Sequence, residues 1–241
     1  MSKVRRSRRL EDSRLISERR ALLDRSQDEH FPYVVEVCDR DFVIHANVFS
    51  PKYFASTDAF SQIFPYRRGD HLLEIGCGCG ATAVLAALKG ATEVVAVDIN
   101  LHAVKNTRAN VRLHDVDALV DVRESDVFSA LRPDERFRTI YWNIPLVYVD
   151  DAYLCRSDLE RSVYDPGYRL AERYLKEAGD WICAGGRILL GFASIGIESE
   201  FLALAEDYGY VCRSVARRAG AKDQGIEFVL HELTPSEPRS G

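Results

Sequence analysis

The stretch Leu72-Leu73-Glu74-Ile75-Gly76-Cys77-Gly78-Cys79-Gly80-Ala81-Thr82 determines how the rest of the chain is interpreted. It begins as a short apolar strand and ends in three alternating glycines that precede a helical pattern. Glycines suit this position because the turn is tight and a ligand must approach bare backbone, while the helix start offers N–H groups to an anion. Taken alone, the loop also fits a plain turn between a strand and a helix.

Strand and helix patterns alternate on both sides of this glycine loop. Strands are expected at 72–75, 94–97, 119–123, 139–142 and 187–192, and helices at 81–89, 101–112 and from Asp165-Pro166 onward. Alternation of this kind predicts right-handed βαβ units in a parallel sheet. A helix at 198–208 and two closing strands, 211–216 and 226–233, complete an α/β fold. We expect a doubly wound, seven-stranded Rossmann-like sheet whose last strand is antiparallel.

Two further elements precede the sheet. Residues 33–38 and 42–49 are β-rich runs around a polar turn, which indicates a β-hairpin. Residues 1–30 form a basic arm that can be helical, but its apolar residues do not gather on one helical face. These residues are Leu10, Leu15, Ile16, Leu22 and Leu23. We therefore expect a solvated or frayed arm, the alternative being a lid or a partner-binding segment.

Composition excludes several classes of protein. The chain has 241 residues, 46% hydrophobic and 29% charged, which are the values of an ordinary globular protein. No apolar run approaches the ~20 residues of a membrane helix, and no apolar stretch follows the first positive charges, so a cytoplasmic location is expected. The six cysteines show no metal-site spacing, so no metal is predicted.

Charge is distributed unevenly along the chain. Residues 1–25 hold nine Lys/Arg against four Asp/Glu, whereas the remainder holds 23 against 33. An acidic body binds nucleic acid poorly, so nucleic acid is not expected as a partner.

Three acidic residues define the expected cofactor. Asp98 lies 22 residues beyond Gly76, at the end of the next strand, where a carboxylate can accept the ribose hydroxyls of an adenosine group. Glu74 suits an ammonium group and would repel a pyrophosphate, which favours S-adenosylmethionine over a nicotinamide cofactor. Asp126 follows the third strand, where it can accept from an adenine amino group.

Together these motifs resemble the class I S-adenosylmethionine-dependent methyltransferases over residues 33–233. Within that group the chain is most similar to the glutamine methyltransferases of peptide release factors and their small-domain relatives, which also carry a hairpin before the core. The resemblance implies that Glu74 and the loop glycines, Gly76, Gly78 and Gly80, hold the methionine part. Asp98 would hold the ribose, and Asp126 with the Val127 backbone the adenine. The same resemblance divides the chain into a basic arm (1–30), a hairpin and cofactor-capping segment (31–68), a catalytic domain (69–234) and a flexible tail (235–241).

The expected catalytic motif is Asn143-Ile144-Pro145-Leu146. Asn143 matches the Asn of the family's Asn-Pro-Pro-Tyr motif, whose side-chain oxygen holds the nucleophilic nitrogen and which also borders the cofactor. The second proline and the terminal aromatic, which stacks on a planar amide or base, are missing. Because the body is acidic and the added elements are too short for a separate recognition domain, we expect methylation of a nitrogen on a small molecule such as an amino acid or a secondary metabolite. Candidate substrate contacts are Tyr148, Asp150, Tyr168 and Ser194.

Three alternatives remain open at this point. The enzyme could use S-adenosylmethionine as the substrate of an intramolecular cyclisation that gives an azetidine-2-carboxylate-type ring and releases methylthioadenosine. It could methylate a nitrogen of protein or RNA, with the basic arm as the contact surface. It could also be a non-catalytic subunit that only binds the cofactor. Partners other than the small acceptor are not expected, and the oligomeric state is left open between a monomer and a homodimer.

Overall fold

A seven-stranded mixed sheet forms the centre of the molecule. The computed structural model describes residues 3–145, 147–220 and 225–236, with side chains from residue 14 onward. The strand order is β10-β11-β9-β6-β3-β4-β5. Neighbouring strands from β5 to β9 are parallel, whereas β11 runs antiparallel to both β9 and β10. This arrangement confirms the fold class, the seven strands and the antiparallel last strand predicted from the sequence.

The helices and strands have the following bounds, given in chain order. The helices are α1 (Lys3–Ser26), α2 (Ser56–Ile63), α3 (Ala81–Leu88), α4 (Leu101–Leu113), α5 (Asp158–Arg161), α6 (Arg169–Glu177), a 3-10 turn (Ala178–Asp180) and α7 (Glu198–Asp207). The strands of the main sheet are β3 (His71–Ile75), β4 (Glu93–Asp98), β5 (Val120–Glu124), β6 (Phe137–Asn143), β9 (Ile182–Ala193), β10 (Tyr210–Ala219) and β11 (Glu227–Pro235). Two small sheets consist of β1 (Tyr33–Val37) with β2 (Arg40–Ile44), and of β7 (Val147–Val149) with β8 (Tyr164–Pro166).

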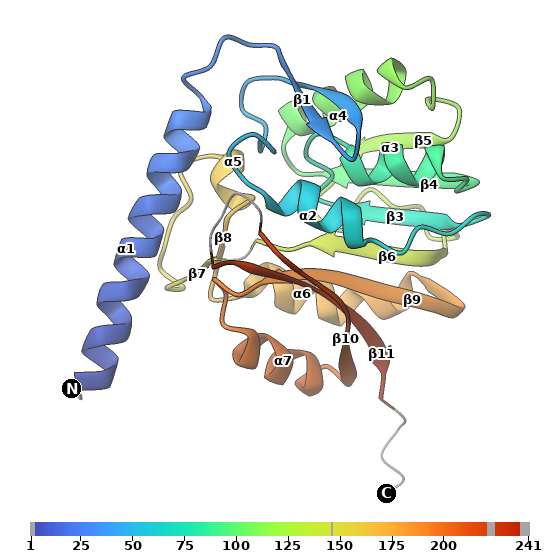
Figure 1. Cartoon of the computed structure of the whole chain (residues 1–241). Helices are drawn as coiled ribbons and strands as arrows, with labels where there is room; N and C mark the ends of the chain where they lie inside the picture. The colour runs from blue at the N-terminus through green and yellow to red at the C-terminus, as the bar shows by residue number, and fades with distance from the viewer. Residues whose placement is uncertain (1–2, 146, 221–224, 237–241) are drawn as a thin grey trace, which may run out of the picture.

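Helices cover both faces of the sheet and bury it. In Figure 1, α2, α3 and α4 lie on one face and α6 and α7 on the other. Positions Leu72 to Ile75 of β3 and Val94 to Val97 of β4 are buried throughout, since a central parallel strand is covered on both sides. One apolar cluster joins β3 and β4 to α3 and the hairpin, and a second joins β6 and β9 to α6 and α7. The cofactor loop therefore starts from a rigid strand end.

The predicted β-hairpin is present and packs on α4. Strands β1 and β2 are joined by a two-residue turn at Cys38 and Asp39, both with positive φ, the geometry that lets two antiparallel strands continue with their natural twist. Asn106 and Asn110 of α4 hold the exposed edge of β2: their side-chain oxygens accept from the backbone of His45 and Val43 at 2.6 and 2.8 Å. The hairpin is thus fixed to the helix that follows β4.

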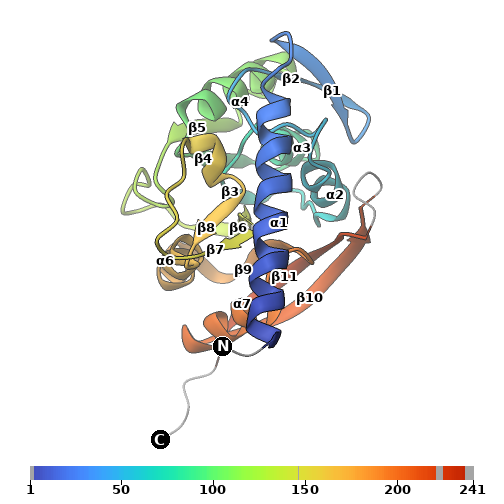
Figure 2. The same ribbon diagram turned by 90° about the vertical axis from the view of Figure 1, so that its left-hand side faces the viewer.

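The N-terminal arm is a long helix, and the expectation that it is solvated or frayed is wrong for residues 14–26. Helix α1 crosses the edge of the sheet at which the parallel strands end, as Figure 2 shows with α1 in front. Leu23 is only 3% exposed, and Leu15, Ile16 and Leu22 are partly buried against the segment that contains β7, α5 and β8. The apolar residues of α1 do not form a broad helical face, because they contact a narrow insertion rather than the face of a sheet.

Two local expectations also need correction. The helix expected from Asp165-Pro166 begins later, at Arg169, because Tyr164–Pro166 pairs as β8 with β7. Asp165 still caps that helix, since its carboxylate accepts from the backbone of Leu170 and Ala171 at 3.0 and 2.9 Å. Of the expected tail 235–241, Pro235 ends β11 and Ser236 donates to the Gly209 carbonyl at 2.7 Å, while residues 237–241 lie outside the described residues.

Candidate active site

The glycine loop joins β3 to α3 in a backbone conformation that other residues adopt only with strain. Gly76, Gly78 and Gly80 have φ values of +65°, +57° and +82°, the left-handed region that lacks a penalty only for glycine. A Cβ on Gly80 would lie 2.7 Å from Thr107 Cγ2, and one on Gly76 would lie 3.1 Å from Trp142 Nε1. A Cβ on Gly78 would meet nothing within 4 Å. Bare backbone at Gly78 therefore faces the cavity, as binding of a cofactor requires.

Glu74 lies beneath this loop, buried and turned toward the start of α3. Its Oε2 accepts from the backbone N–H of Ala83 at 2.9 Å. Burial raises the pKa of Glu74 to about 8, although hydrogen bonds from Thr82 and Ala83 favour the charged form. A carboxyl with such a pKa is mostly protonated at neutral pH and would ionise beside an ammonium group.

Asp98 closes the other side of the loop at the end of β4. Its two carboxylate oxygens accept from the backbone N–H groups of Gly78 and Asn100, both at 2.9 Å. Burial raises the pKa of Asp98 to about 6, opposed by these two hydrogen bonds. The side chain is therefore held in place while part of its surface remains exposed at the cavity. It lies where the sequence placed an acceptor for ribose hydroxyls.

Asp126 and Val127 follow β5 and border the same cavity. Arg173 of α6 donates to Asp126 Oδ2 at 2.6 Å and to the Asp126 carbonyl at 3.1 Å, which leaves Oδ1 for a ligand. Val127 has a φ of +53°, a strained conformation for a β-branched residue. Such strain persists only where surrounding structure enforces it, and it is concentrated at ligand-binding sites.

Asn143 ends the central strand β6 and borders the cavity together with Ile144 and Pro145. Its Oδ1 is buried and has no hydrogen-bond partner among the described residues. A buried acceptor without a donor costs ~1–3 kcal/mol, so this atom is expected to receive a hydrogen bond from a ligand. Ile144 packs into the core below, and Leu146, the fourth residue of the motif, lies outside the described residues.

Two buried polar residues of α4 hold the glycine loop, and a third, Asn106, holds the hairpin segment; all three escaped the sequence analysis. Thr107 Oγ1 donates to the Gly78 carbonyl at 3.0 Å, and Asn110 Nδ2 donates to the Cys79 carbonyl at 2.8 Å. Together with Asn106 they are 0% exposed. The sequence signal that could have identified these residues is their position on the same side of α4 as the buried Val104 and Val111. We call the loop 76–80 with these three residues the floor of the site.

The opposite wall of the cavity comes from α1 and from the insertion that contains β7, α5 and β8. We call these elements the cover. Tyr164 Oη donates to the Ile16 carbonyl at 2.9 Å, and Arg20 pairs with Glu160 of α5 at 3.4 Å and with the Tyr153 hydroxyl. Several cover residues line the cavity, namely Arg19, Asp158, Leu159, Arg161, Ser162 and Val163. The cofactor site is therefore closed over by parts of the chain that the sequence analysis did not connect with it.

The four candidate substrate contacts do not line this cavity. Tyr148 and Tyr168 pack edge to face at 5.1 Å, and Tyr168 Oη accepts from the Ile197 backbone at 3.1 Å. Asp150 accepts from the Ala152 backbone at 3.0 Å, and Ser194 Oγ accepts from the Glu227 backbone at 3.0 Å. Each therefore has a structural role where it stands, and contact with substrate stays a prediction. Aromatic surface at the cavity comes instead from Phe49 and Phe54, whose rings stack at 4.4 Å.

Neither a metal site nor a membrane span is found in the part of the chain that the structure describes. No group of three or more His, Cys, Asp or Glu side chains could hold a metal ion there. No described helix is long and apolar enough to cross a membrane. Cys77 and Cys79 are buried in the floor, and burial raises the pKa of Cys79 to about 12, so these thiols act as small apolar fillers.

The glycine loop, the acids in β3, at the end of β4 and after β5, and the antiparallel β11 are the features of the class I S-adenosylmethionine-dependent methyltransferases. Comparison with known proteins agrees with this class. Residues 39–190 match the model of the methyltransferase small domain. The chain therefore belongs to the methyltransferase small-domain family.

Relatives and solved structures extend this comparison. A ribosomal protein L11 methyltransferase of Exiguobacterium sp. is 34% identical over 36% of this chain and 28% of its own length. A protein of Methanocaldococcus jannaschii named as a protein N5-glutamine methyltransferase is 29% identical over 61% of this chain and 73% of its own. A tRNA methyltransferase structure from the same organism shares the fold, with a TM-score of 0.61 and 16% identity over 87% of this chain and 58% of that one.

These comparisons overturn the predicted partners. The relatives are named for methylation of a ribosomal protein and of protein glutamine, and the fold is shared with an enzyme named for tRNA. The prediction of a small-molecule acceptor, with nucleic acid excluded, is therefore wrong. The physical reason is that net charge and the size of the added segments say little about how large a substrate approaches a cavity. The chain spans 28%, 30% and 39% of the length of the Exiguobacterium, Anoxybacillus and Geobacillus L11 methyltransferases.

Proposed function

We propose that this protein transfers the methyl group of S-adenosylmethionine to a nitrogen atom of a protein substrate. The observation that carries the proposal is the buried Oδ1 of Asn143, which borders the cavity and lacks a hydrogen-bond partner among the described residues. An amide oxygen accepts from N–H and not from a carbonyl or thioether. The names of the relatives support a protein rather than another macromolecule as acceptor.

The proposed chemistry needs orientation more than acid–base catalysis. An acceptor nitrogen whose N–H donates to Asn143 would have its lone pair held toward the sulfonium methyl, and the proton would leave after the C–N bond forms. Glu74 would pair with the cofactor ammonium, and Asp98 would accept from the ribose hydroxyls. Asp126 Oδ1 and the Val127 backbone would contact the adenine. Phe49 and Phe54 provide aromatic surface in place of the family's missing aromatic residue.

The experiment follows both the cofactor products and the acceptor. Purified protein is incubated with S-adenosylmethionine, with and without ribosomal protein L11 or a glutamine-containing peptide, and the nucleosides are separated by chromatography. We expect S-adenosylhomocysteine to form only with an acceptor, which gains the mass of one methylene group. Asn143→Ala should lower turnover by about 100- to 1000-fold while changing cofactor affinity little. Full turnover by Asn143→Ala would show that the acceptor is not held at this residue.

A second candidate function is favoured by the cover. Because α1 and α5 enclose the cavity, a reaction within S-adenosylmethionine itself would need no acceptor to enter. In that reaction the cofactor's amine attacks its own γ-carbon, the C–S bond breaks, methylthioadenosine leaves with the electron pair, and the ring nitrogen gives up a proton. Methylthioadenosine that accumulates without acceptor in the same assay would establish this candidate and exclude methyl transfer.

We also propose the division of the chain into domains that the sequence suggests. We retain residues 69–234 as the cofactor-binding domain and 31–68 as its capping segment. A cytoplasmic location also stays a prediction, which cell fractionation can check, and sedimentation analysis of the purified protein can distinguish a monomer from a homodimer.

A further inference from the structure

A second cavity lies at the opposite edge of the sheet from the active site. It has a volume of about 550 Å³ and is bordered by the starts of β3, β6 and β9. Four of the residues around it are arginines: Arg67, Arg68, Arg136 and Arg138. Asp70 is the one acidic residue among those that line it.

These arginines are exposed and carry uncompensated charge. None of the four forms an ion pair with a carboxylate among the residues that the structure describes. Arg136 is held in place by the carbonyls of Pro133 and Glu135 at 2.9 and 2.7 Å, and it lies over the Trp181 ring, contacts that orient its guanidinium without neutralising it. We call Arg67, Arg68, Arg136 and Arg138 the arginine patch.

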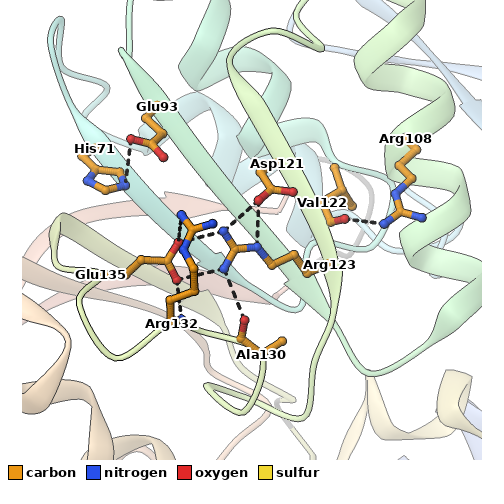
Figure 3. Close-up of polar contacts among 9 residues, drawn as sticks. All are labelled: His71, Glu93, Arg108, Asp121, Val122, Arg123, Ala130, Arg132 and Glu135. Carbon is orange, nitrogen blue, oxygen red and sulfur yellow. Dashed lines mark hydrogen bonds and ion pairs between the residues drawn. The ribbon is translucent and has the colours of Figure 1, made fainter.

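Two of the acidic side chains nearby, Asp70 and Glu135, are engaged with other partners, and Glu93 lies 3.5 Å from His71 Nε2. Asp70 is buried, accepts from Thr139 Oγ1 at 2.7 Å and lies 3.6 Å from the guanidinium of Arg187. Figure 3 shows Glu135 between Arg123 and Arg132, at 2.7 and 2.9 Å.

The positive charge of the patch also reaches the buried Arg187. Burial first, and then the charge of Arg67, lowers the pKa of the Arg187 guanidinium. The carboxylates of Asp70 and Glu232 oppose the effect of Arg67. Because four exposed arginines gather at this cavity beside one buried carboxylate, the patch attracts anions although the chain as a whole is acidic.

We infer that the arginine patch binds the phosphate groups of RNA, at an accessory surface separate from the methyl-transfer site. Guanidinium groups present paired N–H donors that match phosphate oxygens, and they lose little hydration on contact. The four arginines come from two segments far apart in sequence, 67–68 and 136–138, and converge on one cavity. The inference does not depend on which acceptor is methylated.

A polymer fits this surface better than a small phosphate compound. Sites for single phosphate groups bury their ligand among backbone N–H groups or buried side chains, whereas all four arginines here are exposed. Exposed arginines along an open edge instead suit a chain of phosphates, where release of counterions supplies the affinity. Such contacts would position RNA without reading its sequence.

The test measures RNA binding and its salt dependence with the full chain. A fluorescein-labelled, unstructured 20-nucleotide RNA is titrated by anisotropy between 50 and 300 mM NaCl. Each phosphate contact to single-stranded RNA contributes ~0.7 to the slope of log affinity against log salt. The variant Arg67→Gln/Arg68→Gln/Arg136→Gln/Arg138→Gln should therefore lose about 3 from that slope, with at least about 10-fold weaker binding at 100 mM.

A charge-matched variant separates the patch from net charge. It carries Lys105→Gln, Arg112→Gln, Lys176→Gln and Arg213→Gln, four exposed cations away from the cavity. Melting temperature and cofactor affinity, which both variants should retain, establish that each is folded. Equal losses in the two variants, or no loss in the patch variant, would overturn the inference. Binding of pyrophosphate but not of RNA by the wild type would also overturn it.

Discussion

The floor and the cover of the active site are held together by different forces. In the floor, buried side chains of α4 bond to backbone groups of the glycine loop, and the loop's own φ values exclude most other residues. The cover instead joins α1 to the insertion around α5 through apolar side chains, the hydrogen bond from Tyr164 to the Ile16 carbonyl, and the pair of the partly buried Arg20 with the buried Glu160. We therefore expect the floor to tolerate less change than the cover, because its buried hydrogen bonds are directional and its glycine φ values exclude most other residues.

The largest expected effect is in the floor, where two glycines with similar backbone angles differ in their surroundings. Gly80→Ala should destabilise the fold by at least about 3 kcal/mol, because left-handed strain adds to a clash with Thr107. Gly78→Ala carries the same strain but meets open space, so about 1–2 kcal/mol is expected. Chemical denaturation without cofactor measures both. Equal losses would mean that the contact with Thr107 does not constrain the loop.

The next largest effect is expected in the cover. It tests whether α1 is packed, contrary to the sequence-based expectation of a solvated arm. Leu23 is 3% exposed, so Leu23→Ala should cost about 2–3 kcal/mol of stability. Leu22, partly buried on the same helix, is the matched control and should cost less when changed to Ala. A melting temperature unchanged by Leu23→Ala would show that α1 is not packed in solution. Both variants should bind S-adenosylmethionine, since neither residue touches the floor.

The same contrast explains what the sequence could predict. The seven strands of the main sheet and the hairpin follow local periodicity and turn signals, and the structure has them with bounds that differ by a few residues. The cover depends on contacts between residues near 20 and near 160, for which a single sequence carries no local signal. The sequence predicts no strand in the insertion with β7 and β8, because these strands have three residues each. Short strands of this kind are stabilised by tertiary packing rather than by propensity.

A smaller effect is expected from removal of one hydrogen bond in the floor, the bond between Thr107 of α4 and the glycine loop. Thr107→Val keeps the shape but removes the hydroxyl that donates to the Gly78 carbonyl at 3.0 Å. A loss of about 1–2 kcal/mol is expected, because the buried carbonyl then lacks that donor. Thr107→Ser is the control, because it retains the hydroxyl that donates the hydrogen bond and loses only the γ-methyl group. If the Val variant is the more stable of the two, the floor is held by packing and not by this hydrogen bond.

The smallest expected effect is the number of protons that Glu74 releases when the cofactor binds. This number tests whether Glu74 contacts the cofactor ammonium. Burial raises the pKa of Glu74 to about 8, so its carboxyl is about nine-tenths protonated at pH 7 in the free protein. Pairing with an ammonium favours the ionised form. Binding of S-adenosylmethionine at pH 7 should therefore release most of one proton, reduced slightly by the fraction of cofactor amine that must gain one.

The sign of this proton exchange should reverse with pH. At pH 9 Glu74 is already mostly ionised, while a free α-amino group with a pKa near ~8 is mostly neutral and must gain a proton to form the pair. Calorimetry in two buffers of different ionisation enthalpy gives the number of protons exchanged at each pH. Asp98, with a pKa of about 6, is mostly ionised at pH 7 and contributes little. Glu74→Gln should abolish the release at pH 7 and also reduce the uptake at pH 9, because the pair that favours the ammonium form is then absent. Release that persists in Glu74→Gln would assign the proton to another group and separate Glu74 from the cofactor.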